Sequence, residues 1–138
     1  MRTILDDQLC ETLCEEALEK SIEMDLDISF AICDGKGFLL LFRRYGEAPI
    51  FSTMLVPDKA YTAAIMSMST EQLAKLTCDG GPLMGIQNKN PKITLVSGGF
   101  PLIVNGKCIG GIGIGGGHND EDSVIGEYVL SIFNELTD

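Results

Sequence analysis

The apolar positions near the N-terminus repeat every three to four residues. Between about Asp6 and Met24 they form one stripe, comprising Leu9, Cys10, Leu13, Cys14, Ala17 and Leu18. This spacing predicts a helix that buries one face. Another face carries a ladder of like charges at Glu11, Glu15, Glu19 and Glu23. We interpret the ladder as a solvated face, and a weak site for a hard cation is the alternative.

Alternating and β-branched segments follow this helix. Residues 27–33 and 38–43 flank Asp34-Gly35-Lys36-Gly37 and predict a hairpin, with the Asp-Gly pair supplying the positive φ of the turn. Residues 100–104 and 107–114 flank Asn105-Gly106 and predict a second hairpin. The apolar run 93–96 predicts one more strand.

Three further helices are expected. Pro57 suits the first turn of a helix that runs to Met66, and Ser69 can cap a short helix that ends near Leu76. The acidic residues 119–122 predict the start of a last helix, while residues 49–56 give no clear pattern. The order α-β-β-α-α-β-β-β-α with tight hairpins predicts an α+β fold, an antiparallel sheet of about five strands flanked by helices.

Composition and charge narrow the class of protein. The 138 residues are 45% hydrophobic and 22% charged, which predicts one globular domain over residues 1–138. A net charge of −10 argues against nucleic-acid and anionic-membrane partners. The acidic residues concentrate in residues 1–27 and 118–138, so the basic middle would meet a small anionic ligand, through Arg43, Arg44, Lys59 or Lys75. Five cysteines without a CxxC pair predict free thiols and a cytoplasmic location.

The glycine-rich run 111–116 matches GxGxxG literally, but a dinucleotide site is disfavoured. Such a site needs a further parallel strand after the glycines and an open helix N-terminus, whereas Asp120, Glu121 and Asp122 follow here. We expect instead that these glycines thin a strand so that another backbone, a helix or a flat ligand can approach closely.

Catalytic and metal-binding chemistry has little support in the sequence. No GxSxG motif is present, the cysteines lie in ordinary contexts, and no catalytic residue is identified. His118 is the only histidine, which excludes a His₂ or His₃ metal site within one chain, and no metal is expected. A lone loop histidine is usually idle, although one at a glycine-rich junction could reach an iron axially or transfer a proton.

Three stretches together resemble the GlcG/HbpS-like family of haem-degrading domains, which includes the C-terminal domain of PduO-type corrinoid adenosyltransferases. They are the segment Ala31–Gly37 with Arg43, the helix Pro57-Asp58-Lys59-Ala60-Tyr61-Thr62-Ala63-Ala64 with Ser69-Thr70, and the Gly98–Gly115 segment with its acidic cap. The resemblance covers nearly the whole chain. It implies a PAS- or profilin-like α-β-α sandwich and a homo-oligomer, a dimer or a multiple of one.

The resemblance also implies a function. We expect a haem- or tetrapyrrole-binding accessory protein, with a weak haem-degrading activity as an extension of this hypothesis. The alternative is a non-catalytic oligomeric module that assists diol, glycerol or glycolate metabolism through protein contacts. Gly115-Gly116-Gly117 stands where the family commonly has Ser-Gly.

One pocket at a subunit boundary is predicted to hold the ligand. Arg43 and Lys59 would pair carboxylates, Tyr61 would stack, and glycines would permit close approach. The remaining expected lining residues are Gly98, Gly99, Pro101, Gly113, Gly115, Gly116 and His118. In the alternative interpretation, Lys59 forms a local salt bridge and Gly98-Gly99 is only a turn.

The apolar cluster of residues 50–56 exceeds what one helix face of a small domain needs. We therefore expect it to form the interface of the homo-oligomer.

Overall fold

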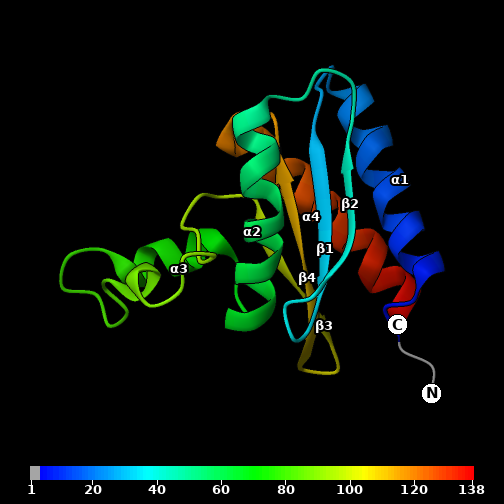
Figure 1. Ribbon diagram of the computed structural model, residues 1–138. Coiled ribbons are helices and arrows are strands. Elements are labelled where there is room, and N and C mark those ends of the chain that lie inside the picture. Colours follow the sequence, from blue (N-terminus) through cyan, green and yellow to red (C-terminus); the bar gives the residue numbers. More distant parts are fainter. Residues whose placement is uncertain (1–3) are drawn as a thin grey trace.

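Two antiparallel hairpins build the sheet. In the computed structural model, which describes residues 4–138, β1 (Ser29–Asp34) pairs with β2 (Leu39–Arg44), and β3 (Gly99–Val104) pairs with β4 (Lys107–Gly115). β1 also pairs antiparallel with β4, so the strand order is β2-β1-β4-β3 (Figure 1). Residues 1–3 of the expected domain lie outside the described residues.

The turns of the two hairpins use different devices. Asn105 and Gly106 both have positive φ, at 52° and 78°, as the expected Asn-Gly turn requires. In the first hairpin the Asp34 carboxylate accepts hydrogen bonds from the backbone N–H groups of Lys36 and Phe38, at 2.9 and 3.0 Å. The positive φ lies at Gly37 (87°), so the expectation that the Asp-Gly pair supplies it is wrong.

Helices cover both faces of the sheet. α1 (Asp7–Glu23) and α4 (Asn119–Thr137) pack on one face, and α2 (Ile50–Met66) packs on the other (Figure 1). The short α3 (Thr70–Thr77) follows α2, and a capping box of Ser69 and Gln72 begins it. A 3₁₀ turn, η1 (Ile86–Asn88), lies in the long connection to β3.

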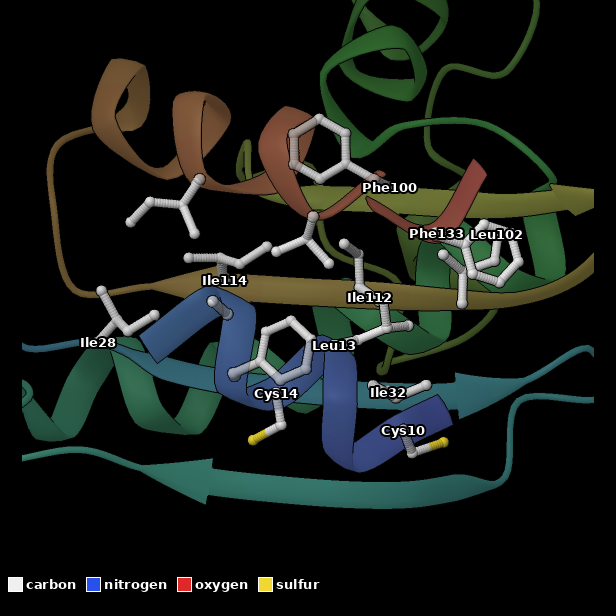
Figure 2. Packing of buried hydrophobic residues seen from close by; sticks show 14 of the residues in the cluster. Cys10, Leu13, Cys14, Ile28, Ile32, Phe100, Leu102, Ile112, Ile114 and Phe133 are labelled. Carbon is white, nitrogen blue, oxygen red and sulfur yellow. The ribbon is translucent and has the colours of Figure 1, made fainter. Parts of the chain in front are cut away.

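The larger hydrophobic core lies between the sheet and the pair α1 and α4. Figure 2 shows side chains from both helices and from β1, β3 and β4 meeting there, and Leu13, Phe30, Ile112, Ile114 and Phe133 are fully buried. The second cluster, beneath α2, is built from small residues. It comprises Ala31, Cys33, Val56, Ala60 and Ala64. α2 can therefore lie very close to the sheet.

The structure differs from the sequence-based expectation in two elements. α2 begins at Ile50 and contains Pro57, which was expected to start the helix. Proline is tolerated there because burial of Val56 and Ala60 against the sheet outweighs one lost backbone hydrogen bond. Residues 93–96 run without a strand partner, so the described sheet has four strands, and the expected fifth strand is wrong.

The α+β class and the antiparallel, helix-flanked sheet are confirmed. Among the helices of residues 4–138, none combines the length and the apolar character that crossing a bilayer requires.

Candidate functional site

A buried ion pair links α2, the end of β4 and the start of α4, and its acidic member, Asp122, was not among the predicted site residues. Lys59 of α2 is 2% exposed, and its Nζ donates a hydrogen bond to the Ile114 carbonyl oxygen of β4 at 2.8 Å. The same Nζ lies 3.7 Å from Oδ2 of Asp122, which is 3% exposed in the first turn of α4. Oδ1 of Asp122 accepts from the Gly117 N–H at 3.0 Å. This arrangement ties both helix layers to the end of β4.

Burial controls the charge of this pair. It raises the pKa of Asp122 to about 6, although Lys59 and the Gly117 N–H oppose the rise. Burial also lowers the pKa of Lys59, against the effect of Asp122. Every buried polar side-chain atom of the described residues has a hydrogen-bond partner, so Lys59 is satisfied by protein groups. The arrangement can exchange a proton at Asp122 near pH 6.

The glycines of β3 and β4 make room for α2. A Cβ atom added at Gly113 would overlap the Val56 carbonyl oxygen, and one at Gly111 would overlap that of Ala60. A Cβ at Gly99 would lie 2.5 Å from the Lys59 carbonyl oxygen. The sequence allowed a backbone, a helix or a flat ligand as the close neighbour of these glycines. In the structure that neighbour is the helix α2.

Some predicted site residues gather around Lys59. Its Nζ lies 2.9 Å from the position of a Cβ at Gly98 and 3.3 Å from that of one at Gly115. Pro101 lies next to this group in the ladder, opposite Gly111. Gly116 has a φ of 132° and packs against the Asp27 backbone.

Tyr61 and Arg43 are bonded to other parts of the fold, whereas His118 adjoins this group, because its carbonyl oxygen accepts from the Asp122 backbone N–H at 2.9 Å. The Tyr61 hydroxyl accepts a hydrogen bond from Asn90 at 2.7 Å, and the ring packs against Gly37 at the β1–β2 turn. Arg43 pairs with Glu11 of α1 at 3.3 Å, across the sheet from α2. His118 is exposed at the N-cap of α4, where its backbone N–H donates a hydrogen bond to the Glu121 carboxylate at 2.8 Å. The cavity described next is lined by none of the predicted residues.

A cavity of about 560 Å³ lies at the opposite end of β4, and sequence reasoning missed it. Apolar side chains form much of its wall: Ile4, Leu5, Leu40 and Ile109. Its polar lining comes from Asp34 and Lys36 at the β1–β2 turn and from Lys107 and Cys108 at the start of β4. The two turns meet here because β1 and β4 are antiparallel, with Asp34 opposite Gly110. That pairing has no local signal in the sequence, which is why the cavity could not be predicted.

The polar groups of this cavity are unequally engaged. The Asp34 carboxylate accepts two hydrogen bonds, both from backbone N–H groups of its own turn. The Cys108 thiol donates to the carbonyl oxygens of Ala64 (3.4 Å) and Gly110 (3.3 Å). Within residues 4–138, no carboxylate lies within 4.0 Å of the exposed ammonium groups of Lys36 and Lys107. The cavity thus combines an apolar wall with two available cations.

Comparisons with known proteins agree with this architecture. The chain is 34% identical over 113 residues to the "Uncharacterized 15.0 kDa protein in dhaT-dhaS intergenic region" of Citrobacter freundii, covering 81% of this chain and 80% of that protein. It is 31% identical to the corrinoid adenosyltransferase PduO of Citrobacter freundii over 80% of this chain, but it spans only 33% of that protein.

Solved structures show the same fold. The crystal structure described as a PduOC:heme complex matches with a TM-score of 0.88 and 28% identity, covering 94% of each chain. The crystal structure of HbpS matches with a TM-score of 0.85 and 24% identity, covering 96% of this chain and 92% of the other. The sequence profile of the family described as "Haem degrading protein HbpS-like" matches residues 5–131, and the chain therefore belongs to this HbpS-like family.

Proposed function

We propose that this protein binds haem or a related tetrapyrrole and acts as an accessory protein that holds this ligand. The observation that carries the proposal is the match to the PduOC:heme complex, which extends over 94% of both chains. Membership of the HbpS-like family supports it. A weak breakdown of the ligand is an extension of the proposal, since bound haem would supply a redox-active iron.

The chemistry of the described residues fits a tetrapyrrole. A haem group has an apolar ring and carboxylate side chains, so it needs apolar walls and cations together. The cavity at the start of β4 offers Leu5, Leu40 and Ile109 beside Lys36 and Lys107. The sequence-predicted residues around Lys59 and His118 remain the second proposed location. Five unpaired cysteines support a location in the cytoplasm as part of the proposal.

Titration with hemin tests the binding function. We expect a saturable shift of the Soret band with one hemin per chain. His118→Ala and Tyr61→Phe test the sequence-predicted site, and loss of the shift in both would assign the ligand to it. A weak shift that grows without saturation in the wild-type protein would refute haem binding.

A second candidate function is that of a non-catalytic oligomeric module that assists diol, glycerol or glycolate metabolism through protein contacts. The observation that favours it is the exposed apolar start of α2, where Ile50, Phe51 and Met54 are 73%, 73% and 69% exposed. Such side chains more often form an interface than a bare surface. Oligomerisation together with non-saturating hemin shifts would favour this function over haem binding.

A further inference from the structure

We propose that the cavity between the two hairpin turns, lined by Lys36 and Lys107, binds the carboxylate-bearing edge of the ligand. Its apolar wall would contact the ring. This inference rests on the proposed tetrapyrrole binding and deepens it, because it assigns the ligand to residues outside the sequence-predicted site. The ligand class is an amphipathic anion, an apolar body with at least one carboxylate.

The size and lining of the cavity suit such a ligand. Small-molecule sites are concave, mostly apolar and about 300–1,000 Å³ in volume, with a few polar groups that fix orientation. The cavity measures about 560 Å³ and is walled by Leu5, Leu40 and Ile109. The wall would bury apolar surface of the ligand, which supplies non-directional affinity.

The charges at the cavity select for carboxylates. Lys36 and Lys107 approach it from two different hairpins, and within residues 4–138 neither ammonium group has a carboxylate partner. Asp34 is the one acid among the lining residues. Its carboxylate already accepts hydrogen bonds from the backbone N–H groups of Lys36 and Phe38. A ligand carboxylate would therefore form charge-assisted hydrogen bonds to two lysines. These cations stand out in a chain whose net charge is −10.

The other end of β4 is less suitable for the carboxylates. Lys59 is buried and already bonded to Ile114 and Asp122, so a ligand would have to break a satisfied ion pair. His118 follows the end of β4, while Cys108 lies near its beginning. At roughly 3.3 Å per strand residue these two residues are more than about 20 Å apart. His118 of the same chain is therefore not expected to reach a ligand in the cavity.

Two matched comparisons test the assignment. Lys36→Ala/Lys107→Ala removes both cavity cations, and Lys20→Ala/Lys89→Ala removes two lysines that do not line the cavity. Each protein is titrated with hemin and with hemin dimethyl ester, in which the carboxylates are blocked. We expect the wild-type protein to bind hemin at least about tenfold more tightly than the ester, since hydrogen bonds to charged groups contribute about 1.5–3 kcal/mol each.

The cavity variant should bind hemin about tenfold more weakly than the wild-type protein does, and it should bind the ester with unchanged affinity. The preference for hemin over the ester is then lost. The control variant and His118→Ala should behave as the wild type does. Circular dichroism and urea unfolding check that each variant is folded, which is expected because both cavity lysines are exposed.

The outcomes separate the inference from the proposed function. If the wild-type protein shows no saturable hemin binding, the proposed function fails, and the inference fails with it. If the wild-type protein binds hemin but the cavity variant keeps full affinity and discrimination, only the cavity assignment is overturned. Loss of binding in His118→Ala, with the cavity variant unaffected, would also overturn it and would favour the sequence-predicted site.

Discussion

The Lys59–Asp122 pair has a large effect on the free energy of unfolding for a single contact, because both groups are buried. Lys59→Met would leave the Asp122 carboxylate buried without its cation, and breaking a buried pair from one side costs about 3–5 kcal/mol. We expect a loss of about 3 kcal/mol in the free energy of unfolding, measured with urea. Glu23→Gln, which breaks the exposed pair with Lys20, should cost less than about 1 kcal/mol. Equal effects of the two substitutions would contradict this account.

The same pair makes a prediction about pH. Because burial raises the pKa of Asp122 from 3.8 to about 6, the folded protein binds the Asp122 proton more tightly than the unfolded chain does. The contribution of this group to stability is therefore greatest below about pH 4 and falls as the pH rises to about 6. NMR titration of the carboxyl carbon should show an inflection near pH 6. An inflection near pH 4 would mean that burial does not govern this carboxyl group.

Among the secondary-structure elements, the approach of α2 to β4 depends on one missing side chain. Gly113→Ala would place a Cβ atom against the Val56 carbonyl oxygen and 2.9 Å from the Ala60 nitrogen, and neither backbone can move freely. Overpacking of this kind typically costs 1–3 kcal/mol, so we expect a loss of about 3 kcal/mol in urea unfolding.

Gly35→Ala provides the control for this substitution. Its Cβ would lie 3.3 Å from the Cys108 carbonyl oxygen at an exposed turn, so the loss should stay below about 1 kcal/mol. A Gly113→Ala protein as stable as the Gly35→Ala protein would show that α2 can shift to accept the methyl group.

Elements with strong local signals were predictable, and elements decided by tertiary packing were not. Asn105-Gly106 determines a hairpin by its own backbone preference, and the stripe through Leu13 and Ala17 determines α1. Pro57 misled the prediction of where α2 begins, because packing against the sheet overrides the local signal. The run 93–96 has the residues of a strand, but the structure gives it no partner strand.

The candidate sites follow the same division. Sequence resemblance brought Lys59 and the neighbouring glycines together, since each lies in a recognisable motif. It did not place Tyr61 and Arg43, because their side chains point to different neighbours that only the fold defines. The cavity depends on the pairing of β1 with β4, which brings Lys36 beside Lys107.

At the scale of the whole molecule, the apolar start of α2 predicts self-association. Phe51 and Met54 are among the most exposed large apolar side chains of the described residues, and the adjacent Leu55 is partly buried. We expect the wild-type protein to be a dimer or a multiple of one, and Phe51→Glu/Met54→Glu to shift it towards the 14.9 kDa monomer in light scattering.

Val124→Glu is the control for this experiment, because Val124 is also an exposed apolar residue but lies on α4. It should leave the mass unchanged. A wild-type protein that scatters as a monomer at micromolar concentration would overturn the prediction.

The strand order also sets how fast this molecule can fold. Each hairpin closes a short loop and can form in about 1–10 μs by itself, whereas the central pairing of β1 with β4 joins segments that are far apart in the sequence. The entropy of closing that long loop is lost before the native contacts form. The transition state is therefore expected to contain the β1–β4 ladder with α2 docked across it, and refolding should take milliseconds or longer. During that interval the edge of β1 that later pairs with β4 is open to other partners, so the rate at which the β1–β4 ladder forms sets how long the chain is exposed to misassembly.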